Sequence, residues 1–523
     1  MSVELNAYSY LVERRLKAGE GQREAARGSE TVTYADLDRL TGEVAAAYRA
    51  LGLQRDDRVV LVMSDDIAML VTILGAFRAG LVAVPVSTMF TGAELGTLVA
   101  DSGARAVFCT HEFADAVSEA VGSAPDVKHV VLHGPATMDV PDAVTPHSWE
   151  DFVALGVAAP QEQHRVAPTD GDAWALWLYT SGTTGTPKAA MHRHANIRHV
   201  CETFGHQVLG IVRDDSTLSI AKMFFAYGIG NSVFFPLSVG ATTVLEPHRP
   251  TPESIRERLE ADRPTLFFGV PTFYAALLSS DVPADTFSSV RLAVSAGEPM
   301  PAVLQARFLD RFGVEIIDGI GSTEALHIFL SNQPADIRPG TTGVPVPGYD
   351  IELRAPSGEL VPAGEPGGLY VRGESIALGY WHRTEASRQV FQGEWLSTGD
   401  TYVRSDDGYY SCLGRSSDML KAGGIWVSPA EVESRLIAHP LVRQAAVVGA
   451  VDTDGLEKPV AVVVADPGVD DVALIEWCRE GLAHFKAPRR ILFLDDLPKT
   501  ATGKVQRFKV RDLLASPPSE VTT

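Results

Sequence analysis

The chain has few cysteines. Four occur in 523 residues, at positions 109, 201, 412 and 478, and none belongs to a CxxC motif. Neither a disulfide framework nor a structural zinc site is therefore expected, and a reducing cytoplasm is the simplest predicted location.

Positive charge is also in short supply. The formal net charge is −21, and lysine is scarce beside arginine. This balance argues against non-specific nucleic-acid binding and against attachment to an anionic membrane surface. Because lysines are few, those that fall inside motifs stand out.

No long apolar run is free of interruptions. The N-terminus carries charges where a signal peptide needs an apolar segment. The longest apolar stretch, residues 67–90, contains Arg78 and then Gly80 and Pro85. It predicts a buried helix, turn and strand, and no membrane span.

The length of the chain predicts two or more domains. Apolar runs such as RVVLVMS, GLVAVPV, ARAVFCT and KHVVLHG alternate with helix-like segments at 35–50 and 66–79, and the alternation resumes after 171. Strands alternating with helices indicate parallel sheets covered by helices. From about residue 340, frequent turn residues and period-2 runs indicate a small antiparallel sheet or barrel.

The last 105 residues or so look like a separate α+β unit. Its first helix has Ser428 as the predicted N-cap, Pro429 at the first helical position and Glu431 at the third. This arrangement predicts a capping box.

Residues 179–190, YTSGTTGTPKAA, form the most unusual stretch. They offer no apolar face, so they are either a flexible linker or a loop that wraps an anion. The stretch directly follows ALWLYT, a buried-type strand, which favours the anion loop. Its glycine spacing does not fit a Walker motif.

Six segments, in order along the chain, resemble the motifs of adenylate-forming enzymes, the superfamily of acyl-CoA synthetases, adenylation domains and luciferases. They are YTSGTTGTPKAAMHRH (179–194), SAGEPMP (295–301), DGIGSTE (318–324), GEWLSTGD (393–400), GYYSCLGRSSDMLKAGG (408–424) and PKTATGK (498–504). The resemblance implies attack of a carboxylate on the α-phosphate of ATP, giving an acyl-AMP, and then transfer of the acyl group to a thiol.

The resemblance, supported by the composition shifts, also implies an α/β fold in two domains. A large N-terminal domain (1–416) would contain two helix-covered parallel-type sheets and a small β-barrel. A small, mobile α+β C-terminal domain (417–523) would carry the catalytic lysine and swing between the two steps. The pivot would follow Arg415, although many members have an aspartate where this chain has Ser417.

Each motif residue acquires an implied role. The β- and γ-phosphates would be held by Thr180, Ser181, Gly182, Thr183, Thr184, Gly185 and Lys188. Adenine and α-phosphate segments would include Gly297, Glu298, Pro299, Asp318, Gly319 and Ile320. Catalysis would use Thr323 on the α-phosphate, Glu324 as the Mg²⁺ ligand and Lys504 on both reactants. The ribose would contact Asp400 and Arg415, and Gly423 and Gly424 would wall a tunnel for the thiol arm.

The acyl pocket is implied to be apolar and flat. With FFAYG and LHIFLSN, the chain resembles benzoate–CoA ligases in particular, which implies a pocket of Phe225, Ala226, Tyr227, Gly297, Gly319, His327, Ile328 and Lys504. Such a slot suits an unsubstituted aryl acid. The aromatics could instead be ordinary core residues, and His327 could support the pocket without touching the substrate.

The acceptor thiol stays open between coenzyme A and the phosphopantetheine arm of an acyl carrier protein, as does the choice between monomer and homodimer. Lys486, Arg489 and Arg490 could line the thiol entrance or form a solvated face. Two other classes compete with the ligase: a kinase-like enzyme that forms ADP, and a nucleotide-binding regulator without catalysis.

Overall fold

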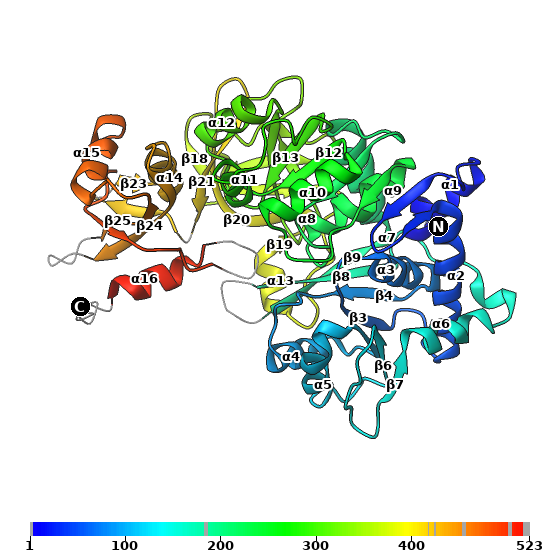
Figure 1. Ribbon diagram of the computed structural model, residues 1–523. Helices are drawn as coiled ribbons and strands as arrows, with labels where there is room; N and C mark the ends of the chain where they lie inside the picture. The colour runs from blue at the N-terminus through cyan, green and yellow to red at the C-terminus, as the bar shows by residue number, and fades with distance from the viewer. Residues whose placement is uncertain are drawn as a thin grey trace.

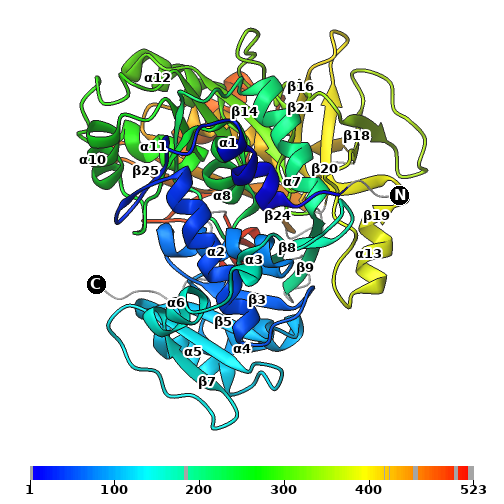
Figure 2. The same ribbon diagram turned by 90° about the vertical axis from the view of Figure 1, so that its right-hand side faces the viewer.

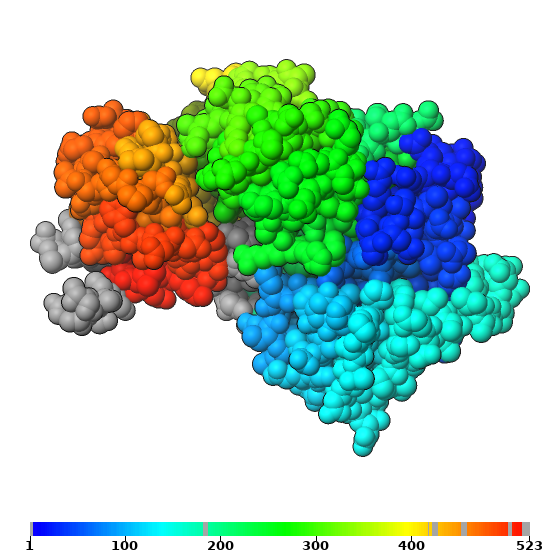
Figure 3. Space-filling view, viewed as in Figure 1, coloured from blue at the N-terminus to red at the C-terminus, as the bar shows by residue number. Residues whose placement is uncertain are grey.

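The computed structural model describes residues 4–181, 187–416, 418–422, 425–451, 457–499 and 505–515. A large N-terminal domain is followed by a small C-terminal domain, which forms the orange and red lobe in Figures 1 and 3. Within these ranges no helix combines the length and apolarity that crossing a bilayer requires.

The first large sheet has seven strands, parallel except for the last. In spatial order they are β7 (Thr145–Ser148), β6 (His129–His133), β5 (Ala106–Thr110), β3 (Arg58–Val62), β4 (Val82–Pro85), β8 (Trp174–Ser181) and antiparallel β9 (Pro187–Arg193). Four of the apolar runs predicted as strands are therefore confirmed as β3 to β6.

The apolar stretch at 67–90 forms α3 (Ile67–Ala79) and then β4, so the predicted helix, turn and strand are confirmed. Asp66 caps the helix by accepting from the Ile67 N–H at 2.8 Å, and Gly80 ends it in the left-handed conformation. An aspartate cap and a C-terminal glycine are common helix boundaries, because both satisfy backbone groups that the helix leaves unpaired.

The second large sheet has nine strands. In spatial order they are β16 (Val344–Pro345), β15 (Ile328–Ser331), β14 (Ile316–Gly321), β13 (Leu292–Ala296), β12 (Leu266–Gly269), β10 (Ser216–Ser219), β11 (Thr242–Val244), β1 (Glu24–Arg27) and β2 (Thr31–Thr33). The strands from β14 to β1 run parallel, and β2, β15 and β16 are antiparallel at the edges.

Helices cover both faces of both sheets. In β3, Val59 and Leu61 join the core between the sheets, whereas Val60 and Val62 join the core under the outer helices. The layer between the sheets includes α2 (Tyr34–Ala50), α3, α7 (His194–Val200), α8 (Ala226–Ile229) and α9 (Phe235–Val239). The outer layers are α4 (Gly92–Ser102) and α5 (Ala114–Val121) on the first sheet, and α10 (Pro252–Asp262), α11 (Pro271–Leu278) and α12 (Ala302–Phe312) on the second. Figure 2 shows α2 and α3 in front of the first sheet.

The region after 340 is a five-stranded antiparallel sheet, as its period-2 runs predict. Its strands are β17 (Asp350–Arg354), β18 (Pro366–Arg372), β19 (Phe391–Gln392), β20 (Trp395–Arg404) and β21 (Tyr410–Arg415), with α13 (Thr384–Val390) before β19.

The C-terminal domain has its own apolar cores. Its elements are β22 (Leu420–Ala422), β23 (Ile425–Val427), α14 (Pro429–Ile437), β24 (Val442–Val451), β25 (Glu457–Ala465), α15 (Asp471–Gly481), β26 (Arg490–Phe493) and α16 (Arg507–Ala515). Strands β24, β25 and β26 form one sheet (Figure 1).

The helix predicted at Ser428 begins there, but the capping box is wrong in one half. The Ser428 hydroxyl accepts from the Glu431 N–H at 3.2 Å and donates to the carbonyl of Leu413 at 2.6 Å. The Glu431 carboxylate instead accepts from Lys486 through both oxygens at 2.7 Å. An ammonium is a stronger partner for a carboxylate than a backbone amide is, because the bond is assisted by both charges.

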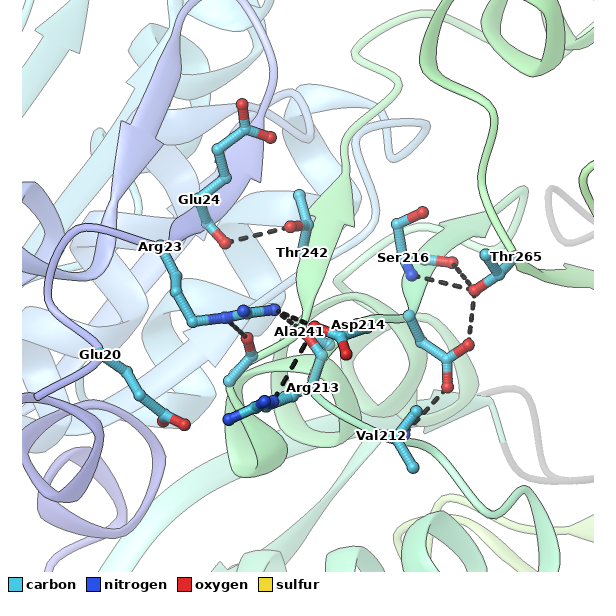
Figure 4. A network of polar contacts seen from close by, with 12 residues as sticks. Glu20, Arg23, Glu24, Val212, Arg213, Asp214, Ser216, Ala241, Thr242 and Thr265 are labelled. Carbon is cyan, nitrogen blue, oxygen red and sulfur yellow. Dashed lines mark hydrogen bonds and ion pairs between the residues drawn. The ribbon is translucent and has the colours of Figure 1, made fainter. Parts of the chain in front are cut away.

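A network of polar contacts connects residues at the amino ends of the parallel strands of the second sheet (Figure 4). Asp215 accepts from Arg291 through both oxygens at 2.8 and 2.7 Å, and Thr265 donates to it at 2.7 Å. Burial raises the pKa of Asp215, but Arg291, Thr265 and the Val212 N–H together lower it below its usual value. Next to it, the exposed Asp214 pairs with Arg23 at 2.9 Å.

We predict that Asp215→Asn lowers the free energy of unfolding by about 3 kcal/mol, because it leaves the Arg291 guanidinium without its counter-charge. The matched control is Asp214→Asn, which should cost less than about 1 kcal/mol because exposed ion pairs contribute little. The Asp214 side chain is 71% exposed and that of Asp215 4%. Urea denaturation of both variants measures the difference, and equal losses would contradict the assignment.

Candidate active site

The predicted site segments lie at one edge of the second sheet. Residues 222–231 follow β10, 297–299 follow β13 and 322–324 follow β14, all at the carboxyl ends of parallel strands. The register pairs Ser295 with Asp318 and Ala296 with Gly319. Loops at the carboxyl ends of parallel strands are the usual ligand sites of open α/β sheets.

The stretch 179–190 includes the end of β8 and the beginning of β9, which pair with each other. Strands β8 and β9 are antiparallel, with Thr180 opposite Lys188 and the backbone of Ser181 opposite Pro187. This pairing, which the sequence interpretation missed, places Lys188 on a strand across from Thr180. The predicted phosphate-binding residues Gly182, Thr183, Thr184 and Gly185 lie outside the described residues.

The turn that carries Thr323 and Glu324 is hydrogen-bonded, through its backbone, to a buried histidine of the first sheet. His192 Nε2 lies 2.8 Å from the Thr323 carbonyl oxygen, and Asn196 Nδ2 lies 3.0 Å from His192 Nδ1. Since a carbonyl only accepts, Nε2 carries the hydrogen and Nδ1 accepts from the Asn196 amide. Burial lowers the pKa of His192 to about 4, so the ring is neutral near pH 7.

A tyrosine holds the Glu324 side chain. The Tyr380 hydroxyl donates to Glu324 Oε1 at 2.6 Å, and the Ala377 N–H donates to the Glu324 carbonyl at 2.8 Å. Lys188 Nζ lies 5.6 Å from the centre of the Tyr380 ring. The cation predicted for phosphate and the carboxylate predicted for metal are therefore both neighbours of Tyr380.

Asp318 is a buried carboxylate on β14. Burial raises its pKa well above the usual value, and the nearby Ser295 hydroxyl and the backbone of Met300 and Gly319 oppose that rise. Its Oδ1 is buried and has no hydrogen-bond partner among the described residues. An unpaired buried acceptor is costly, so this oxygen is suited to a donor that a ligand brings.

The other predicted adenine residues surround Asp318. Gly297, Glu298 and Pro299 follow β13, and Glu298 accepts from the Thr272 hydroxyl at 2.8 Å. Gly319 and Ile320 continue β14 beside β15. A Cβ on Gly319 would lie 2.8 Å from Ile328 Cγ2, so this strand leaves no room for a side chain there.

Asp400 and Arg415 face each other across β20 and β21. Arg415 Nε lies 3.2 Å from Asp400 Oδ1, and Arg415 also donates to the Thr398 carbonyl at 2.7 Å. The two residues predicted to contact ribose therefore form one pair, and Asp400 lies within a strand and not in a simple turn.

The predicted acyl-pocket residues that the structure describes lie at four strands of the second sheet, β10, β13, β14 and β15. Tyr227 donates to the Val294 carbonyl at 3.1 Å, and its ring centroid is 5.5 Å from that of His327. His327 Nε2 lies 3.2 Å from Asn231 Oδ1, and burial lowers the pKa of His327 to about 3. Phe225 is half-buried, whereas Ala226 and Ile328 are buried. The wall of the pocket is apolar, and its one imidazole is neutral.

Several predicted residues lie outside the described ranges. They are Lys504, Gly423, Gly424 and Ser417. The residues on either side of 500–504, Lys499 and Val505, form an antiparallel bridge. Of the predicted entrance cations, Lys486 is engaged with Glu431, whereas Arg489 and Arg490 are exposed.

Comparisons with known proteins fit this geometry. Residues 12–381 match the AMP-binding enzyme family, and residues 431–504 match the AMP-binding enzyme C-terminal domain. The chain belongs to the AMP-binding enzyme family. A benzoate–CoA ligase of Thauera aromatica is 43% identical over 97% of this chain and 95% of its own length.

Solved structures of the AMP-binding family are also similar. A benzoate CoA ligase from Burkholderia xenovorans superposes with a TM-score of 0.88 at 43% identity, covering 97% of this chain and 99% of that one. An anthranilate CoA ligase solved with anthranoyl-AMP superposes with a TM-score of 0.91 at 38% identity, covering 98% of each chain.

The residues that hold the Thr323–Glu324 turn in place are ones that the sequence interpretation missed. His192, Asn196 and Tyr380 lie outside the segments assigned roles, or inside them without one. The one available signal was the spacing of His192 and Asn196, four residues apart at the end of a strand. Nothing in the sequence near 380 indicates contact with Glu324, because the two are 56 positions apart.

We predict that acid destabilises the fold through its buried histidines. Burial lowers the pKa values of His192, His194 and His327 to about 4, 3 and 3. In the unfolded chain these histidines protonate near pH 6.5, so their full contribution to the free energy of unfolding is present above that pH. Below it the free energy of unfolding falls, by about 2 kcal/mol per histidine at about pH 5.

His194→Asn should therefore reduce the fall in Tm between about pH 7.5 and about pH 5. The matched control is His484→Asn, at an exposed histidine, which should leave that fall unchanged. An identical pH dependence in the wild type and in His194→Asn would contradict the prediction.

Proposed function

We propose that this chain is an AMP-forming aryl acid–coenzyme A ligase, with benzoate as the preferred acid. The carboxylate attacks the α-phosphate of ATP, releasing pyrophosphate, and the thiol of coenzyme A then displaces AMP from the acyl-AMP. The observation that carries the proposal is the junction of an apolar aromatic pocket with the Thr323–Glu324 turn, both at the carboxyl edge of one sheet. The AMP-binding family and its benzoate–CoA ligase relatives support it.

The first step brings two anions together, so this chain's residues must position them and offset charge. Lys188 and the loop at 180–185 would hold the β- and γ-phosphates, the leaving group. Thr323 would donate to the α-phosphate, and Asp400 with Arg415 would hold the ribose. The unpaired Asp318 Oδ1 would accept from the adenine amino group, with Gly297, Glu298, Pro299, Gly319 and Ile320 around the ring.

Glu324 fits a magnesium ion. Its carboxylate is a hard oxygen donor, and only one of its oxygens, Oε1, accepts from Tyr380. In the described part of the chain, no cluster of three or more His, Cys, Asp or Glu side chains could hold a metal unaided. Mg²⁺ commonly takes one or two carboxylates together with phosphates and water. When bound, the ion would neutralise phosphate charge.

The pocket explains the choice of acid. Phe225, Ala226, Tyr227 and Ile328 offer flat apolar contacts, and no carboxylate is among the predicted pocket residues to pair with an amine. His327 is buried, and its Nε2 is engaged with Asn231. Because the reacting group is already a carboxylate, no general base is needed, and a neutral His327 supports the wall.

The second step requires the same carbonyl to become accessible to a thiol. Lys504 would hold the carboxylate and the α-phosphate during adenylation, and the C-terminal domain would then rotate about the boundary between 416 and 417. Gly423 and Gly424 would leave space for the pantetheine arm. Coenzyme A is the proposed acceptor, since the similar proteins described above are named as coenzyme A ligases.

Product analysis tests the proposal. Incubation with ATP, benzoate and coenzyme A should give AMP, pyrophosphate and benzoyl-CoA in equal amounts. Omission of coenzyme A should still allow benzoate-dependent exchange of pyrophosphate into ATP, because adenylation comes first. Formation of ADP would contradict the proposal and favour a kinase-like enzyme.

Lys504→Ala is predicted to lower the adenylation rate by at least about a hundredfold while leaving ATP affinity within about threefold, since its charge acts on the reacting groups. The matched control is Lys499→Ala in the same segment, where Lys499 pairs with Asp496 at 2.6 Å. The control should retain exchange activity. Full exchange activity in Lys504→Ala would contradict the role proposed for Lys504.

A further inference from the structure

Asp65 links the first sheet to the acyl pocket. It follows β3, is buried, and accepts from the Met223 N–H through Oδ2 at 2.9 Å. Met223 follows β10 of the second sheet and directly precedes the aromatic segment 224–227. One carboxylate therefore connects two sheets at the point where the pocket begins.

The segment that Asp65 holds has little regular structure of its own. Between β10 and α8, the chain turns at Lys222, whose carbonyl accepts from the Phe225 N–H at 3.0 Å. The turn packs closely on α8, because a Cβ on Gly228 would lie 2.0 Å from the Lys222 carbonyl oxygen. Irregular backbone depends on such specific bonds, since it lacks the repeated pairing of a helix or sheet.

The Lys222 side chain fixes the same turn from the other side. Its ammonium donates to the carbonyl of Glu246 and to that of His248, the latter at 2.6 Å. Both acceptors follow β11. The turn is therefore attached to the first sheet by Asp65 and, by Lys222, to the segment that follows β11 of the second sheet.

Asp65 has few hydrogen-bond partners to offset the cost of burying its carboxylate. Its Oδ1 is buried without a hydrogen-bond partner among the described residues. Burial raises the pKa of Asp65 to about 6, against the lowering effects of Lys222 and of the Met223 N–H. Glu246 and Asp66 are the other charged groups acting on it, and both raise the pKa. A carboxylate whose burial costs this much free energy is expected to have a role beyond stabilising the fold.

We infer that Asp65 is a positioning residue that sets the width of the aryl slot by fixing the turn before Phe224 and Phe225. The inference rests on the proposed function, because it requires that segment 224–227 line the substrate pocket. Asp65 does not touch the substrate. Its loss lets the aromatic segment shift, which weakens aryl-acid binding while the nucleotide contacts, built on β13, β14 and β20, stay in place.

The test is benzoate-dependent exchange of pyrophosphate into ATP, with the KM for each substrate measured separately. Asp65→Ala removes the acceptor of the Met223 N–H and should raise the KM for benzoate about tenfold, with the KM for ATP within about twofold. The matched control is Asp142→Ala, at an exposed aspartate, which should change neither value. A parallel rise in both KM values, or an unchanged KM for benzoate, would overturn the inference.

Asp65→Asn keeps an acceptor but removes the charge, so it serves if the alanine variant does not fold. A neutral acceptor makes a weaker bond than a charged one. The KM for benzoate should therefore rise about threefold and stay flat with pH. In the wild type it should approach the asparagine value as the pH falls through about 6. Identical profiles in the two proteins would overturn the inference.

Exchange activity in the wild type separates the proposed function from the positioning role of Asp65. A wild-type chain without benzoate-dependent exchange would contradict the proposed function, and this inference with it. A wild-type chain with full exchange, whose KM for benzoate is insensitive to Asp65, would contradict only the positioning role.

Discussion

The hydrogen bond between His192 and the Thr323 carbonyl joins the two large sheets at the carboxyl end of β14. His192 lies on β9 of the first sheet, and Thr323 follows β14 of the second. The bond is buried, so either partner left alone would lose hydrogen bonding that water could not replace. Asn196 fixes the tautomer, and burial keeps the ring neutral. The Thr323–Glu324 turn has a defined position because of this contact.

Other contacts repeat the same arrangement at nearby points. Tyr380 holds Glu324, and Asp65 holds the turn before the aromatic segment. His192 and Asp65 each hold irregular backbone at the carboxyl end of a strand, and Tyr380 holds the side chain of Glu324. Such loops can carry ligand-binding groups only when neighbouring elements fix them, because they have no regular hydrogen bonding of their own. The residues with predicted roles in the reaction are thus held by residues to which no such role was assigned.

The secondary structure was largely predictable. Strands β3 to β6 and the helix at 67–79 could be predicted from their apolar runs, because a buried strand or helix needs continuous apolar residues with polar or glycine ends. The motifs predicted the enzyme family, and the comparison with family models confirmed that resemblance. The antiparallel pairing of β8 with β9 and the ion pair that replaces half of the capping box at Glu431 were not predictable, since each depends on a strand or a charge elsewhere.

The sequence by itself determined the alternation of strands and helices, the polar loop after Tyr179 and the residue types offered to a nucleotide and an aryl acid. These follow from local composition, which a chain carries in any conformation. Only the tertiary structure decided that His192 and Tyr380 support the Thr323–Glu324 turn, that Asp318 keeps an unpaired oxygen, and that Asp65 reaches Met223. Those contacts join residues up to 158 positions apart, and such pairs meet only when the two sheets pack around their shared helical layer.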